Sequence, residues 1–292
     1  NNTKTKTNPK ETETMKKVFT NVIKTQISEL AGVNDRDGIR VMLNNFIEGH
    51  TEYKVNSNEY HIRRFLSWLD GETEELQFEM FKVGNSKLPF LNFSTLPVVT
   101  CIGAGICKTY CYSFKAWRYP ASFLRQVQNT LLMSEFDTIK RELKRVLDTS
   151  QFRDLEKVDF RLYVDGDFYT ETDLVNWMEL IRDNPRLITY GYSKSLNLFL
   201  KLHDEKYKFP SNYALNLSNG GIYDDLKKIL KGLYFVRGEF TAMKVEKGEN
   251  IRDNFDHKVF VCPSVCGECT SIGHACGNLD TFKDFEIVIQ LH

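Results

Sequence analysis

The sequence predicts an α/β protein: a full or partial parallel βα barrel (TIM-like) with an N-terminal helical region and a C-terminal cysteine-rich metal-binding segment. Short apolar strands alternate with helices between residues 159 and 236, and no GxGxxG motif follows these strands, which favours a barrel over an open dinucleotide-binding sheet. All seven cysteines lie in two short stretches, 101–111 and 262–276. We expect four parts: a disordered leader (1–15), a helical region (16–75), a barrel-like domain (76–258) and a cysteine-rich segment with a final strand (259–292).

The composition is that of a globular protein. Its 39 basic and 39 acidic side chains cancel, which argues against attraction of the whole molecule to nucleic acid and leaves only local basic patches. No run of about 18 apolar residues occurs, and the polar start NNTKTKTNPKETETM lacks the apolar core of a signal peptide, so we expect no membrane contact and a cytoplasmic location. In a reducing compartment, clustered cysteines of odd number indicate metal or redox chemistry rather than a disulfide framework.

Apolar residues at helical spacing predict three helices after the leader. The first runs from Val18 to a C-cap at Gly32, the second from residue 39 to 47, and the third from an N-cap at Asn58 to residue 69. Residues 76–100 are predicted to be extended and turn structure, and Pro120 opens an amphipathic pattern up to Val146 that fits one helix or a broken pair. The helical region is either a packing appendage or a unit that binds DNA or a partner.

The central region predicts a parallel sheet. Strands are expected at 159–164, 187–192, 213–217 and 233–236, with helices at 172–182, 195–202 and 224–230 between them. In such folds the chemistry lies in the loops after the carboxyl ends of the strands. The polar residues in these loops are Asp165, Asp167, Lys194, Ser218 and Asn219.

Each of these loop residues has a functional interpretation and a simpler one. Asp165 and Asp167 suit a general base, an acceptor for a cofactor hydroxyl or a ligand of a hard metal, and they equally suit the capping of a nearby helix. Lys194 would neutralise a carboxylate or phosphate, or would be a solvated loop lysine. The glycine-rich loop with Ser218 and Asn219 would cradle a polar cofactor, or merely turn.

The first cysteine stretch has the spacing C-x5-C-x3-C. Cys101, Cys107 and Cys111 can bind three irons of a [4Fe-4S] cluster and leave the fourth iron open to a small molecule. Zinc is the competing metal and would require a fourth protein ligand in a structural site, which the second stretch could supply.

Residues around these cysteines suit both a cofactor and a nucleic acid. Gly103 and Gly105 would let the backbone fold closely around a cluster, and Tyr112 would shield it from solvent. Lys115 and Arg118 follow the loop among aromatic residues, an arrangement that suits contact with DNA or RNA but also suits an ordinary helix start.

The second cysteine stretch supplies enough thiolates to close a site alone. Cys262, Cys266, Cys269 and Cys276 are spaced C-x3-C-x2-C-x6-C, which fits zinc or a second iron-sulfur cluster. His274 is either a substitute ligand or a hydrogen-bonding neighbour of the cysteine turn.

Five segments in order, FKVGNSKLP, TCIGAGICKTYCYSFKAWRYP, VDGDFYTETDLVNWMELIRDNP, ITYGYSKS and CPSVCGECTSIGHACG, resemble the phage-associated gene product 88 family over roughly residues 81–277. That family is similar in layout to radical S-adenosylmethionine proteins, in which a cysteine loop ending Cys-Tyr precedes the βα units of a partial barrel. The resemblance implies that Cys101, Cys107 and Cys111 hold a cluster whose open iron binds S-adenosylmethionine. It also implies a phage-encoded protein in a bacterial host.

Together these features predict an iron-sulfur protein that works as a radical-type enzyme on an unknown small-molecule or nucleic-acid substrate. The alternative is a non-catalytic protein, stabilised by zinc or iron-sulfur sites, that binds nucleic acid or a host partner. Iron, sulfide and zinc content per chain would distinguish the two hypotheses.

Overall fold

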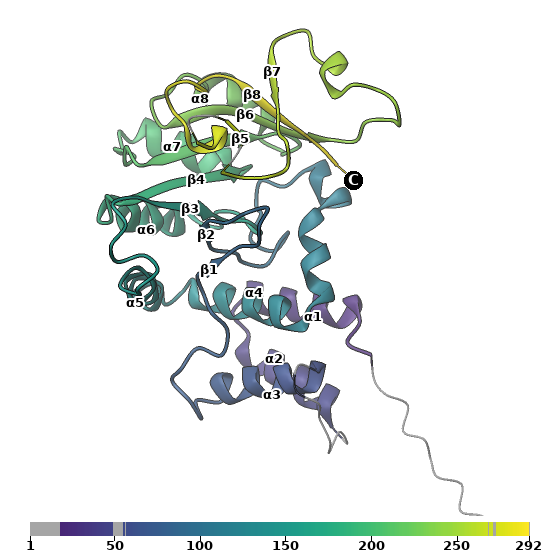
Figure 1. The fold of residues 1–292 in the computed structure, drawn as a ribbon. Coiled ribbons are helices and arrows are strands. Elements are labelled where there is room, and N and C mark those ends of the chain that lie inside the picture. Colours follow the sequence, from purple (N-terminus) through teal and green to yellow (C-terminus); the bar gives the residue numbers. More distant parts are fainter. Residues whose placement is uncertain (1–17, 49–54, 56, 268, 271–272, 292) are drawn as a thin grey trace, which may run out of the picture.

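The computed structural model describes residues 18–48, 55, 57–267, 269–270 and 273–291. The leader predicted at residues 1–15 lies outside these residues. A mostly parallel sheet forms the upper part of the molecule in Figure 1, and the N-terminal helices lie beneath it. Two separate hydrophobic cores correspond to these two layers.

The sheet has eight strands in the described part of the chain, in the order β1-β2-β3-β4-β5-β6-β8-β7. Strands β1 and β2 form an antiparallel hairpin, and each remaining neighbouring pair is parallel. The bounds are β1 Lys82–Val83, β2 Leu91–Asn92, β3 Val158–Leu162, β4 Leu187–Ser193, β5 Tyr213–Ser218, β6 Val236–Met243, β7 Val259–Val261 and β8 Glu286–Gln290.

Strands β2 to β6 follow one another both along the chain and across the sheet. The helices that accompany them pack on one face, because Phe160 of β3 and Leu215 of β5 share a core with Ile139, Trp177 and Phe199 of those helices. These helices are α5 Phe136–Leu147, α6 Glu171–Arg182, α7 Leu196–Asp204 and α8 Lys227–Leu230. Figure 1 shows α5, α6 and α7 together on the left-hand side.

Closure into a barrel is not confirmed. Among the described residues β1 and β7 end the sheet and are not paired with each other. The α/β class and the parallel strands of the prediction are confirmed, whereas the sheet is open at the level of strand pairing.

A second core joins the N-terminal helices to the first helix after the cysteine loop. Side chains of α1 Asn21–Gly32, α2 Arg36–Ile47, α3 Asn58–Leu69 and α4 Pro120–Leu132 form it. The three predicted N-terminal helices are therefore confirmed, but the N-cap of α3 is Ser57, whose hydroxyl accepts a hydrogen bond from Tyr60 N at 3.2 Å. Asn58 was one residue too late as a cap, because serine and asparagine both suit this position.

Two further boundaries needed the structure. The long pattern after Pro120 is a pair of helices, since α4 ends at Leu132 and α5 starts at Phe136. Strand β6 begins at Val236, where the predicted strand 233–236 ended. No helix in the described part of the chain is long and apolar enough to cross a bilayer.

Candidate functional site

The first cysteine loop lies over the carboxyl ends of the parallel strands. It leaves β2 and forms two short 3-10 helices, η1 Ile106–Tyr110 and η2 Tyr112–Arg118, seen as the ribbon on the right of the sheet in Figure 1. Gly105 N and Cys107 N both donate to Gly220 O, at 3.2 and 3.4 Å, and Ile222 N donates to Gly103 O at 2.9 Å. These backbone bonds attach the loop to the loop that follows β5.

Two glycines allow this close approach. A Cβ at Gly103 would lie 1.9 Å from Lys194 O and 2.7 Å from Ser195 N, and one at Gly105 would lie 2.8 Å from Gly220 O. Only glycine fits where backbone meets backbone at such distances. In this structure the predicted close approach is therefore to the loops after β4 and β5, and the role of these glycines toward a cofactor stays a prediction.

Backbone strain marks the entry to the same loop. Val98 has a φ of 69° and Tyr163, just after β3, has a φ of 56°. Left-handed backbone is costly for a β-branched or bulky side chain and persists only where surrounding contacts hold it. Here Cys101 N donates to Val98 O at 3.2 Å, and the Thr100 hydroxyl donates to Leu96 O at 2.8 Å. Hydrogen bonds within residues 96–101 thus hold the turn that carries Cys101.

The three thiols of this loop are half-buried and free. Burial raises the pKa of the Cys101 thiol well above its ordinary value, and the charges of Asp167 and Cys111 act in the same direction, while Lys194 opposes them. Cys101, Cys111, Asp167 and Lys194 therefore lie within electrostatic reach of one another. Two of the predicted loop residues, Asp167 and Lys194, and two of the predicted ligands therefore come together in the fold.

Asp167 is a buried acceptor at the entrance to α7. Its carboxylate accepts hydrogen bonds from Ser193 Oγ at 2.7 Å, Lys194 N at 2.7 Å, Phe168 N at 2.8 Å and Ser195 N at 3.3 Å. Burial raises the pKa of Asp167, and these donors oppose the rise. With its oxygens so engaged, Asp167 positions the loop after β4, and the catalytic role predicted for it gains no support from this geometry.

Asp165 is likewise buried and connects three elements. Its carboxylate accepts from Gln126 Nε2 of α4 at 2.9 Å, and Gln126 in turn accepts from Trp117 Nε1 of η2 at 3.0 Å. Burial raises the pKa of Asp165, and the Ser113 hydroxyl and the charge of Arg161 lower it. The alternative interpretation, in which Asp165 or Asp167 caps the helix that begins nearby, is wrong. The N-cap of α6 is Thr170, whose hydroxyl accepts from Asp173 N.

Lys194 and Ser218 face each other at the carboxyl ends of β4 and β5, where Lys194 Nζ donates to Ser218 Oγ at 2.6 Å. Asn219 instead joins a network with Lys227, Thr241 of β6 and, at 3.4 Å, Glu286 of β8. The structure therefore separates the two residues predicted to bind a cofactor together. Lys194 and Ser218 lie at the cysteine loop, and the Asn219 side chain points toward strands β6 and β8.

Tyr112 links η2 to the strand β3. Its hydroxyl donates to Val164 O at 2.6 Å and accepts from Arg161 Nη2 at 3.3 Å. The Arg161 guanidinium also lies 4.9 Å from the ring centroid of Tyr192. Sequence reasoning missed Arg161. The available signal was a cation inside the apolar strand DFRLYV, on the face opposite Phe160.

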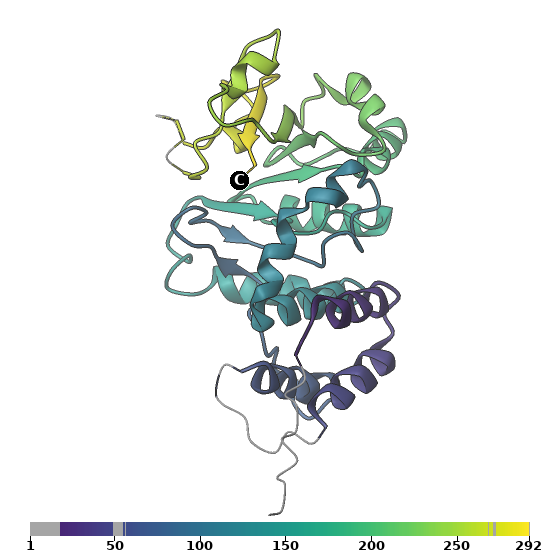
Figure 2. The same ribbon diagram turned by 90° about the vertical axis from the view of Figure 1, so that its right-hand side faces the viewer.

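The second cysteine stretch crosses the face of the sheet that the helices leave free. Cys262 follows β7, Cys266 N donates to Lys87 O at 2.9 Å, and a Cβ at Gly267 would lie 3.4 Å from the Phe90 ring. Cys276 is buried, and its carbonyl accepts from Asn216 Nδ2 of β5 at 2.9 Å. The stretch therefore connects the β7 edge to the β1–β2 hairpin, and Figure 2 shows this yellow segment beside the blue hairpin.

The four thiols of this stretch influence one another. Burial raises the pKa of Cys262, with Cys266 and Cys269 adding to the rise, and burial raises the pKa of Cys276 to about 12, with Cys262 and Cys266 adding. The charge of Arg161 lowers the pKa of Cys262 and Cys266.

Backbone amides also point at two of these sulfurs. Ser264 N donates to Cys262 Sγ at 3.4 Å and Ala275 N donates to Cys269 Sγ at 3.3 Å. Donors of this kind stabilise thiolates in metal sites.

His274 behaves as a hydrogen-bonding neighbour. Its Nε2 lies 3.0 Å from Asp159 Oδ1, and its Nδ1 accepts from Gly277 N at 3.1 Å. The ring also packs against Tyr190, with centroids 4.6 Å apart. Since both ring nitrogens are engaged, the alternative of His274 as a metal ligand is disfavoured.

Neither cysteine set is assembled into a metal site among the described residues. Among the residues that the structure describes, no three His, Cys, Asp or Glu side chains are placed to hold a metal ion. The donor chemistry nevertheless fits a soft metal, because each set consists of free thiols with a glycine cradle or backbone N–H donors around them. Side-chain rotation would have to bring the sulfurs together.

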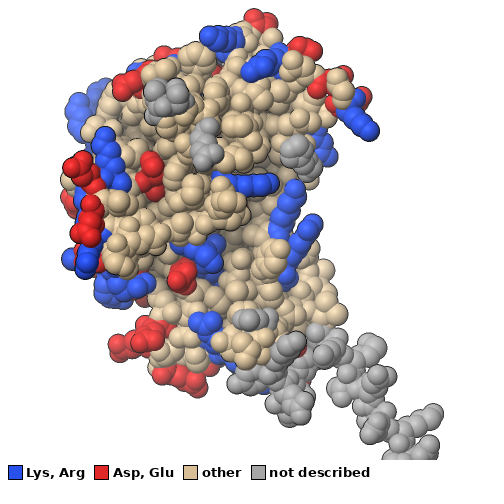
Figure 3. Space-filling view, viewed as in Figure 1, with Lys and Arg blue, Asp and Glu red and all other residues tan. Residues whose placement is uncertain are grey.

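The predicted nucleic-acid contacts, Lys115 and Arg118, are exposed residues of η2. Tyr112, which was predicted to shield a cofactor, is exposed as well, and the three residues are three positions apart. They therefore form an exposed ridge along one side of this 3-10 helix. Figure 3 shows Lys and Arg side chains beside the hollow on the right, over the region where Figure 1 draws these short helices.

Comparison with known proteins gave one match. Neither the curated proteins nor the solved structures include a match. The family model described as gene product 88 matches residues 67–278, which is more than half of the chain and includes both cysteine stretches. The chain therefore belongs to the gene product 88 family.

Proposed function

We propose that this protein is an iron-sulfur enzyme in which Cys101, Cys107 and Cys111 hold an open [4Fe-4S] cluster. The observation that carries this proposal is the position of the loop. Three thiols lie on one segment that is bonded to the loop after β5 and packed on the loop after β4, at the carboxyl edge of a parallel sheet. Sites in parallel α/β folds form at that edge.

The strand order supports a partial barrel as the framework. Consecutive parallel strands whose crossover helices all lie on one face curve the sheet away from those helices, as in a barrel. The cysteine-rich stretch then covers the concave side and joins the two open edges. A cysteine loop after the first parallel strand of such a framework is the layout of radical S-adenosylmethionine enzymes, so we propose S-adenosylmethionine as the cosubstrate.

A cluster with an open iron would supply the electron that cleaves S-adenosylmethionine and starts radical chemistry. The chain itself would provide a cation at Lys194 for the carboxylate of the cosubstrate and a hydroxyl at Ser218 beside it. Asp167 would keep the loop that carries Lys194 in place. The substrate is proposed to be a nucleic acid or nucleotide.

The second stretch is proposed to hold an auxiliary cluster or a zinc ion through Cys262, Cys266, Cys269 and Cys276. Four thiolates on one ion carry excess negative charge, and the half-buried cation Arg161 offsets part of it. Metal in this stretch would fix the cover over the concave face and keep water from the reaction.

Anaerobic reconstitution with iron and sulfide tests the proposal. We expect about four irons and four sulfides at the first site, lost in a triple serine variant of Cys101, Cys107 and Cys111. Cys276→Ser is the matched control, because it should spare the first cluster and remove metal from the second stretch. Addition of S-adenosylmethionine should change the electron resonance spectrum of the reduced protein. Reconstituted protein without iron would overturn the proposal.

The exposed ridge of η2 favours a second candidate, a non-catalytic protein that binds nucleic acid through metal-stabilised loops. Tyr112 offers an aromatic surface and Lys115 and Arg118 offer charge along one side of the helix. In that case metal removal would abolish oligonucleotide binding, and S-adenosylmethionine would have no spectroscopic effect.

A further inference from the structure

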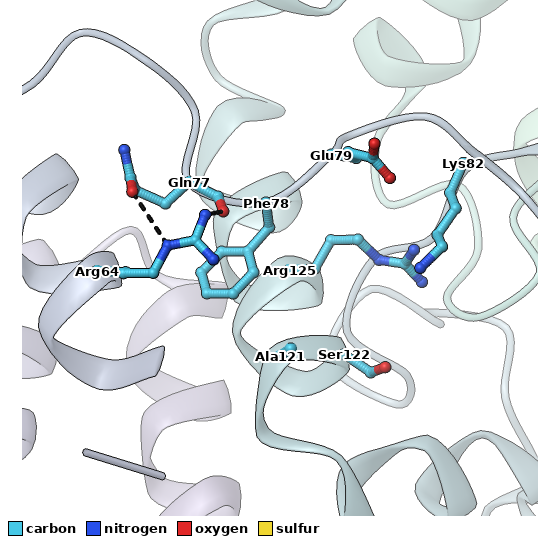
Figure 4. A pocket seen from close by; sticks show the side chains of 8 residues that line it. All are labelled: Arg64, Gln77, Phe78, Glu79, Lys82, Ala121, Ser122 and Arg125. Carbon is cyan, nitrogen blue, oxygen red and sulfur yellow. Dashed lines mark hydrogen bonds between the residues drawn. The ribbon is translucent and has the colours of Figure 1, made fainter. Parts of the chain in front are cut away.

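A pocket lies between the helical layer and the start of the sheet, away from both cysteine stretches. It is enclosed by α3, the segment before β1, β1 itself and the first turns of α4. The lining residues, drawn in Figure 4, are Arg64, Gln77, Phe78, Glu79, Lys82, Ala121, Ser122 and Arg125. Three of these side chains are cations and one is an anion.

Arg125 is the informative residue. Its side chain is half-buried, and its Nε atom is buried without a hydrogen-bond partner among the described residues. Burial lowers the pKa of this guanidinium, and the charges of Asp165 and Glu79 oppose the shift. Asp165 already accepts a hydrogen bond from Gln126 at 2.9 Å. A half-buried guanidinium whose buried Nε lacks a hydrogen-bond partner is costly, and an anionic ligand would reduce that cost.

The two other cations surround the same space. Figure 4 shows Lys82 and Arg125 pointing toward each other from opposite walls, although like charges repel. Arg64 is held at the third wall, where its Nε donates to Gln77 Oε1 at 3.3 Å and its guanidinium lies 5.4 Å from the Phe78 ring centroid. The pocket is therefore preorganised around positive charge.

The start of α4 adds donors to this charge. Ala121 and Ser122 belong to the first turn of α4, a helix of 13 residues. That first turn contains no acidic residue, and the N-cap Tyr119 provides no side-chain cap. The positive end of the helix dipole is thus open to an outside anion. Pro120 has no N–H and Ser122 N already donates to Tyr119 O at 3.0 Å, so the donor that we assign to this turn is the Ser122 hydroxyl.

We propose that this pocket binds a phosphate group. A phosphate monoester carries a charge of about −1.5 to −2 at neutral pH, which matches three cations opposed by one carboxylate. Arginine forks pair with phosphate oxygens in two-point geometry, and Arg125 provides such a fork. Arg64 contributes its charge, because its Nε and Nη2 already donate to Gln77. The phosphate belongs either to a free nucleotide or to the backbone of a nucleic acid. The phosphate site is independent of the proposed metal sites. None of its lining residues is a cysteine or belongs to the residues to which the metal proposal gives a role.

Titration of the 292-residue chain with inorganic phosphate, ATP and a fluorescent single-stranded oligonucleotide tests this inference. Binding of phosphate or ATP, weakened at least tenfold in Arg125→Gln, would identify a free nucleotide. Binding of the oligonucleotide alone, with the same loss, would identify the nucleic-acid backbone, and the slope of log affinity against log salt should then fall by about 0.7 to 1.

Two further variants distinguish a loss of binding from a loss of folding. Lys82→Gln changes an exposed side chain of the same pocket and should also weaken binding. Arg141→Gln removes an exposed arginine of α5 outside the pocket and should bind as the wild type does. Absence of binding by all three probes, or equal binding by Arg125→Gln, Lys82→Gln and the wild type, would overturn the inference.

Discussion

Replacement of Gly103 by alanine tests how the first cysteine loop is held. A Cβ there would lie 1.9 Å from Lys194 O, whereas ordinary contacts start at 3.4 Å, so the loops would have to separate by about 1.5 Å. The opposing atoms are backbone and cannot rotate away. The φ of Gly103 lies outside the left-handed region, so the penalty is steric.

The expected stability cost is that of overpacking, about 1–3 kcal/mol, or a few degrees in Tm for a chain of this size. The relative loss of iron binding should be far larger than the relative loss of stability. Thiolate-metal distances tolerate only about 0.2 Å, and Cys101 lies two residues from the displaced position. The variant should therefore fold but bind little iron at the first site.

The assay combines thermal unfolding with iron and sulfide per chain after anaerobic reconstitution. Gly232→Ala is the matched control, because Gly232 has a φ of 89° and nothing within 4 Å of a built Cβ. That control should lose about 1 kcal/mol through left-handed backbone and keep its iron. Wild-type iron content in Gly103→Ala would refute the reasoning, as would equal iron loss in both variants.

Three further predictions concern buried polar groups. Burial raises the pKa of Asp173 from 3.8 to about 7, so the folded chain keeps a proton that the unfolded chain loses. The free energy of unfolding should therefore fall by up to about 4 kcal/mol as pH rises from about 4 to 7. In Asp173→Asn the urea midpoint should depend less on pH. Asp167→Ala strands several donors and should cost about 2–4 kcal/mol in urea unfolding, which a wild-type midpoint would contradict. Arg161→Met should weaken metal at the second stretch about 10–100-fold in chelator competition, and unchanged affinity would exclude a role for its charge.

The sequence carried most of the secondary structure and little of the site geometry. Periodic apolar residues located α1 to α3 and the strands β3 to β5, because each buries one face or one stripe. The same reasoning placed the last central strand too early, since the apolar run 233–236 precedes β6 and the strand itself contains Arg237 and Glu239. A strand whose cation is buried by tertiary contacts cannot be recognised from apolar pattern alone.

The roles of single polar residues could be assigned only from the tertiary structure. Asp167 follows a strand as a catalytic acid would, yet its partners Ser193, Lys194 and Ser195 come from the end of the next strand and the loop after it. Two arginines could be assigned a role only from neighbours far along the chain. Arg161 lies near the four-thiol stretch, and Arg125 lines a pocket with Lys82.

By itself the sequence determined the α/β class, the helical layer, the family and the confinement of all seven cysteines to two stretches. These are local properties, set by periodicity, composition and spacing. Only the tertiary structure decided that the first stretch lies on the loops after β4 and β5 while the second joins the open edges of the sheet. Such contacts join residues 91 to 179 positions apart, and they depend on chain geometry and close packing that no short pattern encodes.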